Sequence, residues 1–189
     1  ADVPAHVGDL GVLGVGGHIS AHDVQIAQFR FARSIEMDLF VRKNVVTSPK
    51  TVVKLADGAV TLTDTVVEPL KKGVPMKTNL VGDELDFSAL MRDLGVSDHA
   101  HVQWDLHELK VLGLAGTLDP LRLDGDLTIV TSDFAVYDKA RDDPTHQRIV
   151  GFKEARVQSR VVVRDTSLDF KNIRAQLPNS WIEGGFCSI

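Results

Sequence analysis

Apolar and polar residues alternate over most of the chain, which is the pattern of β-strands that bury one face. Ile35, Met37 and Leu39, for example, would share one side of such a strand. The same alternation returns in residues 102–107, 127–129 and 157–164. Glycines separate these stretches, and the pair Asp124-Gly125 predicts a tight hairpin. We therefore predict an all-β fold of roughly ten antiparallel strands that follow one another in a meander.

One segment departs from this alternation. Residues 87–94 carry apolar side chains at helical spacing, with Asp86 before them as N-cap and Gly95 after them as a stop. This predicts a short helix that covers a sheet end or the mouth of a groove. Residues 138–147 are polar and predict an exposed loop, the one structural break expected in a single continuous β-repeat segment spanning residues 1–189.

Residues of the same parity within each predicted strand form one apolar face, because successive side chains of a strand point to opposite sides. The predicted members of this face are Ile35, Met37, Leu39, Val60, Leu62, Val102, Trp104, Leu106, Leu127, Ile129, Val157, Val161, Val163, Leu168 and Phe170.

Composition narrows the class of protein. Hydrophobic residues make up 43% of the chain and charged residues 25%, as in ordered globular proteins. The formal net charge of -5 argues against a nucleic-acid partner and against a strongly anionic membrane surface. The chain starts at Ala1 and its last residues have the pattern of a strand, so we expect a segment of a longer protein.

Histidines give the only metal hypothesis. On a regular strand His99, His101 and His107 would share a face with Gln103 and Asp105. Imidazole and carboxylate groups bind Zn²⁺, but nothing in the pattern fixes a third ligand at the required distance. We therefore predict a solvated strand face, with no metal and no cofactor.

No catalytic motif is visible. The sequence lacks a Gly-x-Ser-x-Gly elbow, a phosphate-binding Gly-x-x-x-x-Gly-Lys-Ser/Thr loop and a His-Glu-x-x-His helix. Cys187 is the only cysteine and has no basic neighbour in the sequence to lower its pKa. Asp142 and Asp143 lie in the predicted loop, without an apolar pocket to separate their pKa values. We predict that the chain is not an enzyme.

Two stretches resemble the repeating β region of AsmA-like proteins, most closely of the TamB-type translocation and assembly module proteins. Residues 102–127 contain Gly116-Thr117-Leu118-Asp119-Pro120-Leu121, which is similar to a family phrase at the junction of two strands. Asp124 is inserted before the glycine of that phrase. Residues 168–184 are similar to a second family pattern, although Trp181 stands where Arg or Lys is usual.

This resemblance implies a long, twisted, half-open β-groove in the periplasm of a Gram-negative envelope, anchored to the inner membrane by a segment outside this chain. It further implies phospholipid transport along the apolar face, membranes at the two ends of the full-length protein and an outer-membrane assembly protein as a partner.

An apolar sheet face is unfavourable in water and has to be covered, and the sequence leaves two alternatives for what covers it. Acyl chains are one, because each buried methylene contributes roughly 0.8 kcal/mol without requiring a particular side chain. A second sheet is the other, which would make the chain a closed β-sandwich binding or adhesion module.

Overall fold

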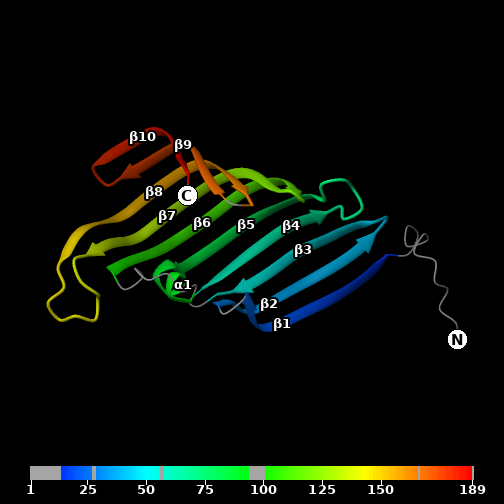
Figure 1. Cartoon of the computed structure of the whole chain (residues 1–189), viewed down its shortest axis with the longest axis horizontal. Helices are drawn as coiled ribbons and strands as arrows, with labels where there is room; N and C mark the ends of the chain where they lie inside the picture. Colours follow the sequence, from blue (N-terminus) through cyan, green and yellow to red (C-terminus); the bar gives the residue numbers. More distant parts are fainter. Residues whose placement is uncertain (1–13, 27–28, 56–57, 94–100, 166, 189) are drawn as a thin grey trace, which may run out of the picture.

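Ten antiparallel strands form one sheet in the computed structural model of this chain (Figure 1). The structure describes residues 14–26, 29–55, 58–93, 101–165 and 167–188. The strands are β1 (Val15–Ile26), β2 (Phe29–Arg42), β3 (Val45–Lys54), β4 (Ala59–Val67), β5 (Pro75–Asp86), β6 (Val102–Leu118), β7 (Leu121–Tyr137), β8 (Arg148–Arg164), β9 (Ser167–Leu177) and β10 (Ser180–Ser188). Each strand pairs with the next along the chain, and β1 and β10 are the two edges of the sheet. The predicted all-β, open antiparallel array is confirmed.

The predicted helix is also confirmed. Helix α1 (Phe87–Asp93) lies between β5 and β6. The Asp86 carboxylate accepts a hydrogen bond from the Ala89 backbone N–H at 3.0 Å, which is the N-cap that the sequence indicates. The predicted stop, Gly95, lies outside the described residues. Helix α1 contacts β6 and also β2, although β3 and β4 separate β2 from β5 in the sheet. The sheet therefore curls toward the side that carries the helix.

A seam of β-bulges crosses the sheet and explains part of this curl. The strand register shifts near the middle of the β4–β5, β5–β6, β6–β7 and β8–β9 pairs. Asp64, Gly113 and Asn172 lie in this seam with φ of 53°, 61° and 54°. Left-handed backbone of this kind is tolerated best by Gly, Asn and Asp. Because a bulge bends its strand and increases the local twist, a row of bulges curves the whole sheet.

The predicted hairpin at Asp124-Gly125 is wrong, because both residues lie inside β7. A Cβ on Gly125 would come within 3.0 Å of the Leu114 Cα and of the Val111 Cγ1 on β6. Gly125 is therefore required by the close approach of β6 and its side chains and not by a turn. The exposed loop predicted at residues 138–147 is present, and it joins β7 to β8, which pair along their length.

Candidate apolar groove

Three cross-strand rows make up the side of the sheet that we define as the apolar face. Residues directly opposite each other in neighbouring strands lie on the same side of a sheet. The first row is Val15, Val41, Val46, Val67, Met76, Gly116, Leu123, Val163 and Leu168. The second is Ile19, Met37, Thr51, Leu62, Leu80, Val111, Leu127 and Ser159.

The third row crosses all ten strands without a polar side chain. It is Ala21, Ile35, Val53, Val60, Gly82, Leu109, Ile129, Val157, Ala175 and Ile182. No charged residue occurs in any of the three rows. The apolar face is therefore continuous from one edge of the sheet to the other.

Burial on this face falls from the centre to the edges. Val111, Leu114, Leu123, Leu127 and Val161 form the buried cluster, and Leu127 is only 6% exposed. At the two edges, Ile19 on β1 is 46% exposed and Ile182 on β10 is 58% exposed. The described strands form a single sheet, so no second sheet of described residues covers this face. Curvature buries the centre of the face and leaves its margins open.

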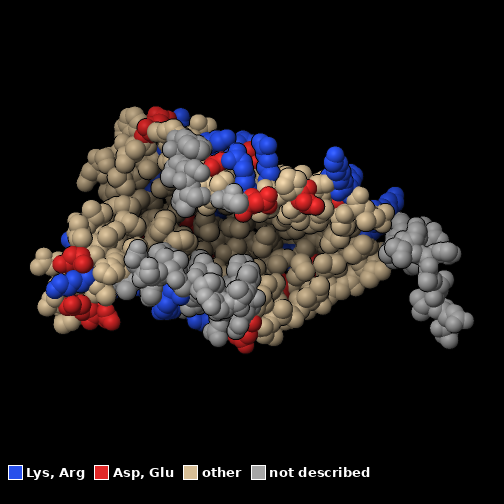
Figure 2. Space-filling view, viewed as in Figure 1, with Lys and Arg blue, Asp and Glu red and all other residues tan. Residues whose placement is uncertain are grey.

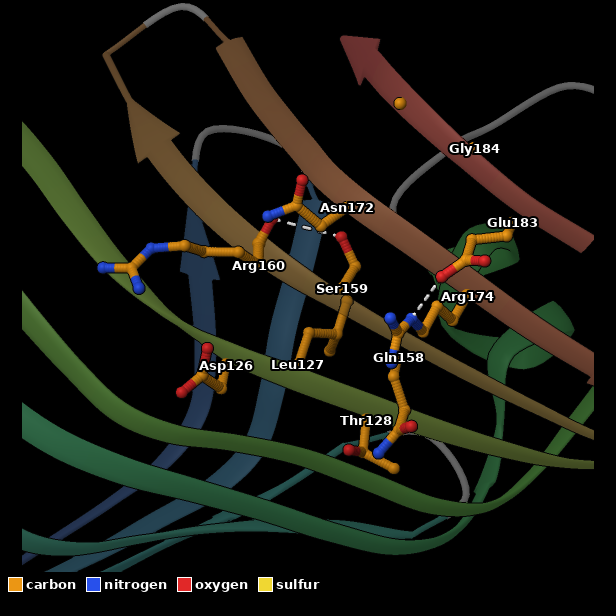
Figure 3. A pocket seen from close by; sticks show the side chains of 11 residues that line it. Asp126, Leu127, Thr128, Gln158, Ser159, Arg160, Asn172, Arg174, Glu183 and Gly184 are labelled. Carbon is orange, nitrogen blue, oxygen red and sulfur yellow. Dashed lines mark hydrogen bonds and ion pairs between the residues drawn. The ribbon is translucent and has the colours of Figure 1, made fainter.

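The apolar face is on the inside of the curl. In Figure 3 the polar side chains of β7 to β10 point toward the viewer, and β1 and β2 lie behind those strands. The apolar side of β7 to β9 therefore faces β1 and β2. The space-filling view in Figure 2 shows a hollow along the centre of the molecule with mostly uncharged walls.

The hydroxyl groups that interrupt the face are bonded within the protein. Thr65 Oγ1 and Thr78 Oγ1 are 2.8 Å apart, and Ser48 Oγ lies 3.0 Å from Thr51 Oγ1. Ser159 Oγ donates to the backbone carbonyl of Lys171 at 2.9 Å. Because these hydroxyls are already hydrogen-bonded, they add little polarity to the surface of the groove.

The structure brings most of the predicted lining residues onto this face. The third row contains Ile35, Val60, Ile129 and Val157, and the second contains Met37, Leu62 and Leu127. The first contains Val163 and Leu168. Val161 and Phe170 lie opposite each other between the first and second rows, Leu39 lies opposite Gly17, and Leu106 lies opposite Leu85 and Thr131.

The alternation predicted from Val102 through Trp104 to Leu106 is kept on β6, but the ladder to β7 is irregular on both sides of Leu106. Ser132 is an extra residue on β7 between the pairs of Asp105 and Leu106, so that Leu106 lies opposite Thr131 and Trp104 opposite Phe134. Val102, Trp104 and Leu106 therefore keep one parity along β6, and the phase of β6 changes only after Leu106, where His107 is the extra residue. The Trp104 ring packs edge-on against Phe87 of α1, with ring centroids 4.7 Å apart, and its Nε1–H donates to Thr131 Oγ1 at 3.2 Å.

Leu106 itself is 2% exposed, so its side chain is buried. It lies opposite Leu85, which is also buried and directly precedes the N-cap of α1. A sequence pattern gives parity but not bulges, so the change of phase at His107 is not visible in the sequence.

The opposite face of the sheet carries charged residues, several of them in cross-strand ion pairs. His18 Nδ1 lies 2.9 Å from Asp38 Oδ1, Arg160 lies 2.6 Å from Asp124 Oδ1, and Arg174 Nε donates to Glu183 at 2.7 Å. The Lys110 ammonium is hydrogen-bonded to Glu108, which holds the pKa of that carboxyl below its usual value. The sheet is therefore amphipathic, with one charge-free face and one solvated face.

A hollow of about 730 Å³ lies on this charged face over β7 to β10 (Figure 3). Arg160, Arg174, Asp126 and Glu183 line it, and Arg174 is already paired with Glu183. The hollow holds acids and bases in equal number, so it selects neither an anion nor a cation.

The histidine pattern does not converge in the structure. His99 lies outside the described residues. Gln103 Nε2 donates to Asp105 at 2.9 Å and Gln103 Oε1 accepts from the Tyr137 hydroxyl at 3.1 Å, while His107 Nδ1 lies 2.5 Å from Glu84 Oε1. Among the described residues, no group of three or more His, Cys, Asp or Glu side chains is arranged to hold a metal ion.

No family model matches this chain, and neither a curated protein nor a solved structure does. In the described part of the chain, no helix has the length and apolar character that crossing a membrane requires.

Proposed function

We propose that this chain is a non-catalytic segment of a lipid conduit, in which phospholipid acyl chains cover the apolar face. The observation that carries the proposal is the third row, which crosses ten strands with no polar side chain and with no second sheet of described residues over it. Such a surface is unfavourable in water, and burying its apolar area would contribute about 25 cal/mol per Å².

The chemistry of the face suits an acyl chain. Aliphatic side chains dominate it, and its few hydroxyls are bonded to one another or to the backbone. Each methylene that leaves water contributes roughly 0.8 kcal/mol, so an acyl chain binds without any specific contact. Binding of this kind has little preference for position, which allows a lipid to move along the surface.

The open edges support the same proposal. Ile19 and Ile182, one at each margin of the apolar face, are half exposed. A chain lying in the groove would bury both side chains while its headgroup stays in water. Together with the resemblance to AsmA-like proteins, this supports a periplasmic role in a protein anchored to the inner membrane, with an outer-membrane assembly protein as a further partner.

Photo-crosslinking at adjacent positions tests the proposal. A benzophenone amino acid replaces Ile129, on the apolar face, or Thr128, the preceding residue along β7, which points to the charged face. Both positions are half-buried, so accessibility is matched. After irradiation in cells, mass spectrometry should detect phospholipid attached at position 129 and none at position 128. Equal labelling of the two sites, or labelling of neither, would favour a binding or adhesion module that does not transport lipid.

A further inference from the structure

Charge is distributed unevenly between the two ends of the strands. In a meander, alternate turns lie at the same end of the sheet. The turns β2–β3, β4–β5, β6–β7 and β8–β9 share one end, on the right in Figure 1. We define the turn rim as residues 42–45, 68–74, 118–122 and 164–165.

The turn rim is basic in a chain whose formal net charge is -5. Its basic residues are Arg42, Lys43, Lys71, Lys72, Arg122 and Arg164, and its acidic residues are Glu68, Asp119 and Asp165. At the opposite end, the β7–β8 loop carries Asp138, Asp142 and Asp143 against Lys139 and Arg141. Figure 2 shows Lys and Arg side chains at the rim end and mixed charges at the loop end.

Hydrogen bonds join three of the four turns into one surface. The backbone N–H groups of Leu118 and Asp119 donate to the Gly73 carbonyl at 3.0 Å and 3.2 Å, which ties the β6–β7 turn to the β4–β5 loop. The Leu121 N–H donates to Asp165 Oδ1 at 3.1 Å, which ties the same turn to the β8–β9 turn. The basic residues of these three turns are therefore held close to one another.

Some basic side chains of the turn rim form ion pairs with carboxylates of this chain, and others are exposed to solvent. Lys71 pairs with Glu68, and Arg164 pairs with the buried carboxylate of Asp169. Lys43, Lys72 and Arg122 are exposed and have no ion pair within the described residues. Leu70 is 76% exposed, the highest fraction among the exposed large hydrophobic residues that the structure describes, and it directly precedes Lys71 and Lys72.

From this arrangement we propose that the turn rim docks on the surface of an anionic lipid bilayer, with Leu70 inserted between headgroups and Lys43, Lys72 and Arg122 over them. A basic residue near an anionic surface is attracted to it, and an apolar side chain at the tip of the same loop enters the interface. The net charge of the whole chain does not prevent this, because charges farther from the surface than a Debye length of roughly 8 Å are screened.

Cosedimentation with lipid vesicles tests the inference. The full chain is mixed with vesicles of phosphatidylcholine, or of phosphatidylcholine with phosphatidylglycerol. We expect binding only to the second kind, weakened by added salt. The triple variant Lys43→Gln, Lys72→Gln and Arg122→Gln should bind about a hundredfold more weakly, because each neutralised residue costs a factor of about five near an anionic surface.

The matched control neutralises three exposed basic residues away from the rim, Lys139→Gln, Arg141→Gln and Lys153→Gln, with the same change in net charge. It should bind as the unmodified chain does. Leu70→Ala should weaken binding about tenfold to fiftyfold, since it removes three apolar carbons from the interface, whereas Ile149→Ala, at an exposed site near the opposite end of the strands, should not. Circular dichroism checks that every variant is folded.

Three results would overturn the proposal. The first is equal binding to neutral and anionic vesicles. The second is an equal loss of vesicle binding in the rim triple variant and in the control triple variant. The third is unchanged vesicle binding of Leu70→Ala together with release of the protein from vesicles by soluble polyphosphate. The last result would make the rim a general polyanion site. Vesicle binding does not depend on lipid in the groove, so failure here leaves the crosslinking result at Ile129 unaffected.

Discussion

Gly116 on β6 lies so close to Arg122 on β7 that a Cβ on Gly116 would overlap the Arg122 carbonyl carbon and oxygen. Its φ of +154° is also one that L-residues rarely adopt. Since the obstacle is backbone, it cannot rotate away as a side chain does. The close approach of two neighbouring strands at the rim end of the sheet therefore depends on a missing side chain.

Gly116→Ala should consequently destabilise the fold by about 3 kcal/mol or more, through strain and overpacking together. Gly113→Ala is the control, because φ at Gly113 is +61° but a Cβ there would have no atom within 4 Å. It should cost only about 1 kcal/mol. Urea unfolding followed by circular dichroism measures both. Equal costs for the two variants would contradict this account of Gly116.

The N-cap of α1 gives a second prediction. Asp86→Ala removes the acceptor of the Ala89 N–H bond and should destabilise the protein by about 1 kcal/mol. Asp86→Asn keeps an acceptor oxygen and should be close to neutral, because Asn and Asp are equally good N-caps. Thermal unfolding distinguishes them. If Asn is as damaging as Ala, the Asp86 charge and not its hydrogen bond stabilises this end of the sheet.

The sequence predicts the apolar face well because a strand has a side-chain period of two. Ile35, Val60, Ile129 and Val157, chosen by parity in four separate strands, fall in one cross-strand row. The same holds for the helix, where Asp86 as a polar cap before an apolar helical repeat is a local signal. Period, cap and turn residues act over a few residues, so they can be found in the sequence alone.

Bulges and close contacts between strands depend on how the strands pair, so they could not be predicted from the sequence. The register shift between Leu106 and Glu108, where His107 is the extra residue, changes the parity of β6 relative to Leu109 and Val111. Gly125 follows Asp124, as in a hairpin turn, yet it lies opposite Val161 inside the sheet. The clustering of basic residues on one rim was also missed, because the turns that carry them are far apart in the sequence.

The ion pair between Glu108 and Lys110 predicts a pH effect. The hydrogen bond from Lys110 lowers the pKa of Glu108 in the folded protein. Glu108 therefore adds stability that is complete above its unfolded pKa and is lost as the pH falls through its folded pKa. Lys110→Met should raise the pKa of Glu108, measured by carboxyl-carbon NMR titration. Lys153→Met, at an exposed site on β8, is the control and should leave it unchanged. An unmoved pKa in Lys110→Met would refute the assignment.

Metal removal should have no effect on stability. His107 pairs with Glu84, and the described histidines do not form a set of three ligands with neighbouring side chains. A ligand that binds the folded state raises its stability, so removal of a structural metal would lower the melting temperature. We expect the same melting temperature with and without a chelator. A drop that Zn²⁺ reverses would instead identify His99, His101 and His107 as ligands.

The last prediction separates the centre of the apolar face from its margin. Leu127 is buried in the cluster, so Leu127→Asp would place an unpaired charge among Val111, Leu123 and Val161. The cost should be about 3 kcal/mol or more, enough to unfold much of the protein. Ile182 is 58% exposed on the edge strand, and a carboxylate there remains in water. Ile182→Asp should therefore leave the unfolding midpoint nearly unchanged.

Ile182→Asp should nevertheless weaken lipid labelling from position 129, because Ile182 lies in the same cross-strand row as Ile129 and an acyl chain would have to pass a charge. Trp181→Asp is the control: Trp181 is its neighbour on β10, also exposed, and points to the opposite face. That variant should label like the unmodified protein. If Trp181→Asp lowers labelling as much as Ile182→Asp does, the lipid is not held by the apolar face, and position 129 reports contact with the membrane instead.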